Sequence, residues 1–197
     1  MKKIITSESV AAGHPDKVCD QISDAILDAY LKEDPNAHVA VECMAAFDTL
    51  YISGEVTSKA RVNYENVARE TIKRIGYDDP EYGFKYDDIS VFVKVHEQSS
   101  DIDMGVSLKD DIGAGDQGIM YGFACDETEA FLPLPYYLSS QMMRRLDEIK
   151  KDYEFLGPDG KGKSALNTKT ENRSASRRSF FPTSTARTSN LRMSASS

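Results

Sequence analysis

The hydrophobic and polar positions of this chain follow two periods, and the changes between them mark the expected elements. Residues 2–10 partly alternate between β-branched and polar residues, which predicts a first strand. From Pro15 the apolar residues fall at helical spacing, and this pattern ends near Pro35. Further predicted elements are strands over residues 38–47, 50–58 and 89–95, and a helix over residues 62–75 that ends at Gly76.

This order of predicted elements indicates an α+β fold. Residues 1–96 would form one complete β-α-β-β-α-β unit, a mixed or antiparallel sheet covered on one face by two helices. Residues 97–118 are polar and glycine-rich with few apolar anchors, which is typical of a lid over an active site, and residues 97–112 are the expected flexible loop. A strand over residues 119–125 and a helix over residues 136–151 would begin a second unit, residues 113–161, which stays truncated.

The periodic pattern ends at residue 162, and the charge changes sign there. Residues 162–197 contain nine serines, seven Lys and Arg and one acid, so this tail carries a net charge of +6 and residues 1–161 carry −14. An acidic body argues against general nucleic-acid binding, which relies on cations that neutralise phosphates. The tail is expected to be disordered. It is either a nucleic-acid or membrane arm, or sequence foreign to this fold.

Other features of the composition predict a cytoplasmic protein without a zinc site. The chain has no apolar run of about 18 residues, and its start lacks the apolar segment of a signal peptide. We therefore expect neither a membrane nor a nucleic acid among its partners. Reduced thiols are predicted for the three cysteines, which are odd in number and widely spaced: Cys19, Cys43 and Cys125.

The sequence GHPDK, residues 13–17, has the residue types of a phosphate site at the start of a helix. Proline suits the first helical position because it lacks the N–H that would stay unpaired there. The free N–H groups of the first turn, together with the helix dipole, attract phosphate. His14 and Lys17 would add donors to a polyphosphate, and Asp16 is a hard oxygen ligand for Mg²⁺. The alternative is a capped helix whose His14 and Lys17 are merely solvated.

Weaker candidates lie further along the chain. The hexapeptide GAGDQG, residues 113–118, offers Asp116 to a hydroxyl or amine group, or is simply a mobile hinge. Glu42 and Glu55 fall in predicted strands, where a carboxylate more often faces water. No Ser/His/Asp or Cys/His arrangement supports a nucleophilic hydrolase.

The stretch TSESVAAGHPDKVCDQISDAILDAYLKEDPNAHVAVE, together with GAGDQG and the following IMYGFA, closely resembles the N-terminal portion of the S-adenosylmethionine synthetase family. The resemblance extends from residue 4 to residue 161. It implies that methionine sulfur attacks C5′ of ATP and expels the triphosphate, which is hydrolysed to pyrophosphate and phosphate. It also implies three β-α-β-β-α-β units, the cofactors Mg²⁺ and K⁺, and a homo-oligomer, a dimer or a tetramer, with sites between subunits.

The same resemblance implies roles for individual residues. His14 would be the catalytic residue at the ATP phosphates, and Asp16 would bind Mg²⁺. Glu42 would be the carboxylate associated with K⁺. The positions that would contact methionine are Glu55, Gln98 and Asp116, and those that would contact ATP beside His14 are Lys17, Asp159 and Lys161.

The chain departs from the family pattern after Lys161 and ends at about half the usual length. The missing half would carry a second glycine-rich signature and further lysines and aspartates that hold the triphosphate and Mg²⁺. A reading-frame shift near Gly162 would explain the sudden loss of both periodicity and family resemblance. On this hypothesis the chain is a methionine adenosyltransferase by descent, with little activity alone because the triphosphate clamp is incomplete. The alternative is a non-catalytic regulatory partner of a full-length synthetase.

Overall fold

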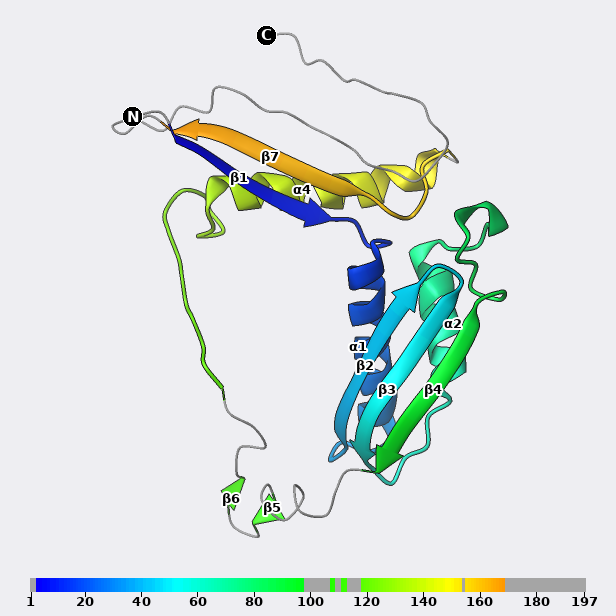
Figure 1. The fold of residues 1–197 in the computed structure, drawn as a ribbon. Helices are drawn as coiled ribbons and strands as arrows, with labels where there is room; N and C mark the ends of the chain where they lie inside the picture. Colours follow the sequence, from blue (N-terminus) through cyan, green and yellow to red (C-terminus); the bar gives the residue numbers. More distant parts are fainter. Residues whose placement is uncertain (1–2, 98–106, 109–110, 113–117, 154, 169–197) are drawn as a thin grey trace.

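The computed structural model describes residues 3–97, 107–108, 111–112, 118–153 and 155–168, and within them the chain has the predicted α+β composition. Figure 1 shows two layered parts that meet where the first strand passes into the first helix. Each part is a small sheet with helix on one face. The sequence GHPDK (residues 13–17), which we call the GHPDK loop, lies at this junction, and its last three residues form the start of the first helix.

The larger part is a three-stranded mixed sheet covered by two helices. Strand β2 (His38–Ala46) is antiparallel to β3 (Thr49–Thr57), and β3 is parallel to β4 (Ser90–Glu97). Because parallel neighbours cannot be joined by a tight turn, the chain crosses from β3 to β4 through helix α2 (Tyr64–Ile75). Helix α1 (Pro15–Glu33) packs beside α2 and against β2.

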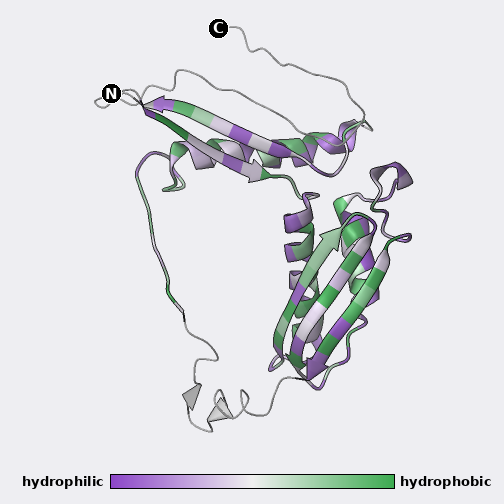
Figure 2. Cartoon of the chain, viewed as in Figure 1, coloured by the Kyte–Doolittle hydropathy of each residue, from purple (hydrophilic) through white to green (hydrophobic). Residues whose placement is uncertain are grey.

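Apolar residues from both helices and the strands bury the inner face of this sheet. Apolar positions alternate with polar ones along β2 and β3, as expected for a sheet with one covered face (Figure 2). The elements predicted between residues 15 and 97 are all confirmed. The buried core residues are Val18, Ile22, Ile26, Tyr30, Ala68 and Ile72 from the helices, Val41, Leu50, Ile52 and Val56 from the strands, and Tyr77, Phe84 and Ile89 from the segments between α2 and β4.

The first strand belongs to the other part of the molecule. Strand β1 (Lys3–Val10) pairs in antiparallel register with β7 (Lys161–Thr168), with Val10 opposite Lys161. The prediction that residues 1–96 share one sheet is therefore wrong, and a repeat of complete β-α-β-β-α-β units is not confirmed. The reason is non-local. Residues 11–14, which we call the bend, direct β1 away from β2 and toward a strand from the far end of the described chain.

Helix α4 (Leu134–Ile149) covers one face of the β1–β7 pair and ends in the 3-10 turn η2 (Lys150–Asp152), which confirms the predicted helix. Met143 is buried at the centre of this contact. Gly162 of β7 lies so close to Met143 that a Cβ on Gly162 would overlap the terminal methyl group of Met143. A larger residue at this position would therefore require the end of the Met143 side chain to move.

Strand β7 also corrects the expected end of the periodic sequence. Residues 162–168 continue a regular strand instead of a disordered tail. Gly162, Ser164 and Leu166 are buried and Lys163 is exposed, so burial alternates although only one of the three inward residues is strongly apolar. Small and polar inward residues hide this strand from a hydrophobicity pattern. The rest of the predicted tail, residues 169–197, lies outside the described residues.

The strand predicted over residues 119–125 is not formed. This segment is described and carries no strand, and it runs clear of both sheets in Figure 1. Its large apolar side chains are 78% to 92% exposed: Ile119, Met120, Tyr121 and Phe123. An alternating segment becomes a strand only where a neighbouring strand accepts its hydrogen bonds, and within the described residues β1 and β7 pair with each other instead.

Three short elements complete the described chain. The 3-10 turn η1 (Pro80–Tyr82) follows α2, and β5 (Ser107–Leu108) is antiparallel to β6 (Asp111–Ile112). Residues 98–106 and 109–110 of the expected flexible loop lie outside the described residues. In the part of the chain that the structure describes, no helix has the length and apolar character needed to cross a membrane. The three cysteines are free in the structure: Cys19, Cys43 and Cys125.

Candidate functional site

The junction between the two parts ends at the N-cap of α1, which is His14. Its Nδ1 accepts a hydrogen bond from the Asp16 backbone N–H at 3.3 Å. A neutral imidazole whose Nδ1 accepts carries its proton on Nε2. The side chain of His14 is 24% exposed, so one ring nitrogen caps the helix and the other keeps a donor for a ligand.

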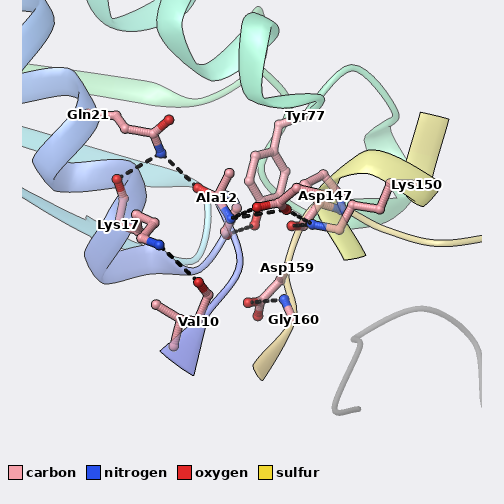
Figure 3. A network of polar contacts seen from close by, with 11 residues as sticks. Val10, Ala12, Lys17, Gln21, Tyr77, Asp147, Lys150, Asp159 and Gly160 are labelled. Carbon is pink, nitrogen blue, oxygen red and sulfur yellow. Dashed lines mark hydrogen bonds and ion pairs between the residues drawn. The ribbon is translucent and has the colours of Figure 1, made fainter. Parts of the chain in front are cut away.

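The two charged side chains of the first turn differ in their availability. The side chain of Asp16 is 90% exposed, at the helix end where a negative charge is favoured. Lys17 instead reaches back along the chain, and its Nζ donates to the carbonyl oxygen of Val10 at 3.0 Å (Figure 3). Asp16 is therefore open to a cation, whereas Lys17 is more than a solvated residue because it fixes the end of β1.

The segment that follows η2 brings the smaller part against the same bend. The carbonyl oxygen of Gly160 accepts from the Ala11 N–H at 2.7 Å, and Asp159 Oδ1 accepts from the Gly160 N–H at 2.7 Å. Lys161 forms an ion pair with Glu8 of β1 at 3.1 Å. The structure thus brings Asp159 and Lys161, both predicted to contact ATP, to the junction that carries the GHPDK loop.

A cavity of about 180 Å³ lies beside the first turn of α1. Its wall includes Pro15, Asp159 and the aromatic rings of Tyr77, Tyr82 and Phe84. Burial, and then the negative charge of Asp159, raise the pKa of Tyr77 to about 12. The cavity is smaller than the roughly 300–1,000 Å³ of typical small-molecule pockets, so within the described residues it would hold only a fragment of a ligand.

Glu42 and Glu55 lie on the open face of the larger sheet, away from the helices. Glu42 is exposed, and Glu55 is half-buried between Ala40 on β2 and His96 on β4. Among the described residues, no hydrogen bond or ion pair joins either carboxylate to residues 13–17. The structure does not bring these two residues to the GHPDK loop, and their roles toward K⁺ and methionine stay predictions.

The donor set at the junction suits a metal ion that is shared with a ligand. The structure describes no group of three or more His, Cys, Asp and Glu residues placed to hold a metal ion, within the ranges given above. Mg²⁺ is usually held by one or two carboxylates while substrate phosphates and water supply the other ligands. The single exposed carboxylate of Asp16 fits such a site. The predicted methionine contacts Gln98 and Asp116 lie outside the described residues.

Sequence reasoning missed the side chains that form hydrogen bonds with the backbone of the bend (Figure 3). The hydroxyl of Tyr77 donates to the Gly13 carbonyl oxygen at 2.5 Å, and the carboxylate of Asp147 accepts from the Ala12 N–H. Neither residue belongs to a motif. Tyr77 follows a helix-ending glycine, which is a local signal for a fixed position, whereas nothing near Asp147 in the sequence points to residue 12.

Comparison with known proteins assigns the class of this chain. Residues 2–100 match the family model of the S-adenosylmethionine synthetase N-terminal domain, and residues 111–178 match that of the central domain. The chain therefore belongs to the S-adenosylmethionine synthetase family. The second match extends beyond residue 161, where the resemblance was expected to end, and it includes all of β7.

Individual relatives agree with this assignment. An S-adenosylmethionine synthase from Clostridium botulinum is 49% identical over 174 residues, which cover 82% of this chain and 44% of the relative. That from Solidesulfovibrio magneticus is 49% identical over 167 residues, 83% of this chain and 43% of its own length. That from Mesoplasma florum is 45% identical over 169 residues, 84% of this chain and 45% of its own length. The chain spans less than half the length of these relatives.

Proposed function

We propose that this chain carries the N-terminal and central parts of a methionine adenosyltransferase, which forms S-adenosyl-L-methionine from ATP and L-methionine and releases phosphate and pyrophosphate. The observation that carries the proposal is the junction itself. The His14 cap with its remaining donor, the exposed carboxylate of Asp16 and the segment with Asp159 and Lys161 meet at one helix start. They do so in a member of the S-adenosylmethionine synthetase family.

The displacement at C5′ of ATP needs little proton transfer, but it needs aligned reactants and compensation for the charge on the leaving triphosphate. His14 would donate from Nε2 to a phosphate oxygen near the bond that breaks, at the positive end of the α1 dipole. Lys17 would contribute one of its remaining N–H donors. Asp159 and Lys161 would contact ATP from the other side of the junction.

The remaining site residues complete this proposal. Asp16 would hold Mg²⁺, which when bound neutralises negative charge on the triphosphate. Glu42 would be the carboxylate associated with K⁺. Glu55 would contact methionine together with Gln98 and Asp116.

We also propose that the protein is a homo-oligomer, a dimer or a tetramer, formed through the open face of the larger sheet. Met44, Tyr51 and Phe92 on this face are 58%, 44% and 54% exposed, and the rings of Tyr51 and Phe92 stack with centroids 5.1 Å apart. Contiguous exposed apolar residues are typical of an interface. Glu42 and Glu55 share this face, so they would then lie between subunits.

The same face supports the second candidate, a non-catalytic partner that pairs with a full-length synthetase. In that case the chain would join a full-length relative and would form no S-adenosylmethionine by itself. A cytoplasmic location, with neither a membrane nor a nucleic acid as partner, belongs to both candidates.

Binding of tripolyphosphate to the 197-residue chain tests the proposed site. Titration calorimetry with and without Mg²⁺ should show binding that depends on Mg²⁺. Asp16→Asn should raise the Kd about tenfold, because it removes a charged oxygen ligand. Asp20→Asn is the matched control, since Asp20 is an exposed carboxylate one turn further along α1. Binding that ignores Mg²⁺, or equal losses in both variants, would remove Asp16 from the metal site.

A further inference from the structure

The carboxylate of Asp147 holds the bend from the side of the smaller part. Its Oδ1 and Oδ2 lie 3.3 and 3.2 Å from the backbone nitrogen of Ala12, so both oxygens share one N–H donor. Lys150 pairs with Asp147 at 2.8 Å and also donates to the carbonyl oxygen of Pro158. The side chains of Lys150 and Asp147 are only 13% and 33% exposed, so this pair is shielded from water and salt more than a surface ion pair.

The bend is also held from the side of the larger part. The Tyr77 hydroxyl donates to the Gly13 carbonyl oxygen at 2.5 Å, and Gln21 Nε2 donates to the Ala12 carbonyl oxygen at 2.8 Å. A Cβ on Gly13 would overlap the backbone of Pro158, so these two residues pack closely and a side chain at position 13 would not fit. Figure 3 shows the contacts at Ala12, and together with the Tyr77 bond to Gly13 they fix two consecutive residues from both parts of the molecule.

The charges of Asp147 and Lys150 matter because these side chains contact the backbone next to the proposed anion site. Ala12 is two residues from His14, and the His14 N–H donates to the Ala11 carbonyl oxygen at 3.1 Å within the same bend. A carboxylate forms a stronger hydrogen bond with a backbone N–H than a neutral acceptor does. An unpaired carboxylate in this place would also repel a polyphosphate, and the ammonium group of Lys150 cancels that charge.

Resting on the proposed function, we propose that Asp147 and Lys150 are positioning residues for the GHPDK loop, the proposed polyphosphate site. Asp147 fixes the Ala12 backbone and with it the orientation of His14 and the first turn of α1, and Lys150 neutralises Asp147. Neither residue contacts substrate in this role. A helix of the smaller part thereby determines how tightly the loop at the start of α1 holds an anion.

Tripolyphosphate titrations of variants of the 197-residue chain, in Mg²⁺ and at several ionic strengths, test this role. Asp147→Ala should raise the Kd about tenfold, because the Ala12 N–H loses its side-chain acceptor and the loop is no longer held in place. Asp147→Asn should stay within about threefold of wild type, since the amide oxygen still accepts from Ala12. Glu148→Ala is the control, because this exposed neighbour on α4 forms its ion pair with Arg145 on the same helix.

Lys150→Met provides an independent electrostatic readout. The unpaired carboxylate should weaken binding several-fold, and the ratio to wild type should be largest at low ionic strength because salt screens the repulsion. A merely structural role would not produce this salt dependence. Circular dichroism identifies the folded variants. If Asp147→Ala does not fold, the proposal is tested by comparing Lys150→Met, which should lose affinity at low ionic strength, with Asp147→Asn, which should stay near wild type.

The possible results separate the positioning role from the proposed function. Wild-type affinity in folded Asp147→Ala, or equal losses in Asp147→Ala and Asp147→Asn, would overturn the positioning role while the proposed function stands. A loss in Lys150→Met that does not change with salt would overturn the neutralising role of Lys150. Absence of binding by the wild-type chain would overturn the proposed function, and the positioning role with it.

Discussion

At the scale of single residues, the junction uses side chains that each satisfy a local requirement and serve the site. His14 caps α1 through Nδ1 and keeps its Nε2 donor for a ligand. Tyr77 is buried and donates to the Gly13 carbonyl oxygen. Burial and the negative charge of Asp159 raise the pKa of Tyr77 to about 12, so its hydroxyl stays a donor far above neutral pH.

This raised pKa predicts how the stability of the Tyr77→Phe variant depends on pH. The ordinary pKa of tyrosine is 10.0, so the unfolded chain loses the phenol proton first, and wild-type stability should fall between pH 10 and 12. Near pH 8 Tyr77→Phe should be less stable by about 1 kcal/mol, because the hydrogen bond is lost. Toward pH 12 the difference should shrink and reverse, changing by about 2 to 3 kcal/mol in total.

Urea unfolding between pH 8 and pH 11.5 measures this difference. Tyr136→Phe is the control, because Tyr136 is an exposed ring on α4. A stability difference between wild type and Tyr77→Phe that stays constant over this range would contradict the assigned environment of Tyr77.

At the scale of elements, the end of α2 determines where Tyr77 lies. Gly76 has a left-handed φ of 111°, and its N–H bonds to the carbonyl oxygen of Lys73 at 3.0 Å. The Tyr77 N–H then bonds to the carbonyl oxygen of Ile72 at 3.2 Å, which completes a Schellman motif. The helix therefore stops at the residue that allows the following ring to reach the bend.

Substitution of Gly76 tests this helix end. Gly76→Ala should lower the free energy of unfolding by about 1 kcal/mol, because a Cβ is strained in the left-handed region. A Cβ here would lie 3.8 Å from Pro158, an ordinary contact, so the loss would come from the backbone alone. Gly76→Asn should lose less, since asparagine tolerates this conformation. Equal losses in urea unfolding for the two variants would indicate that left-handed strain does not decide the stability.

At the scale of the whole molecule, the two parts differ in how far apart their segments lie in the sequence. The larger part is formed by consecutive residues, whereas the smaller part joins β1 to α4 and β7 from the other end of the described chain. The GHPDK loop links them. The larger sheet leaves its outer face open, and this face carries the apolar residues of the proposed subunit interface.

Phe92→Lys tests that interface. A lysine in the stacked pair with Tyr51 would place a charge in the centre of the buried surface, so the variant should be monomeric where wild type is a dimer or a tetramer. Size-exclusion chromatography with light scattering measures the mass. Leu31→Lys is the control, since Leu31 is a half-exposed apolar residue on α1 and lies away from this face. Self-association that survives Phe92→Lys would exclude this face as the subunit interface.

The sequence by itself determined the elements of the larger part and the start of α1. Their signals are local: alternation along β2 and β3, helical spacing from Val18 to Ile26, and Pro15 after a capping His14. The expected roles of His14 and Asp16 came from residues next to one another in the chain, whereas those of Asp159 and Lys161 came from the family resemblance. The structure adds that the two segments meet through the Ala11 and Gly160 backbones.

Only the tertiary structure decided which strands pair and what holds the bend. The partner of β1 is β7, and the carboxylate behind Ala12 comes from Asp147, more than a hundred positions away. No local pattern encodes such contacts, because they depend on where two distant segments meet. Gly162 of β7 lies against Met143 of α4, and residues 119–125 form no strand within the part of the chain that the structure describes. Local periodicity predicts which residues of an element are buried, but the fold of the rest of the chain decides which other element packs against them.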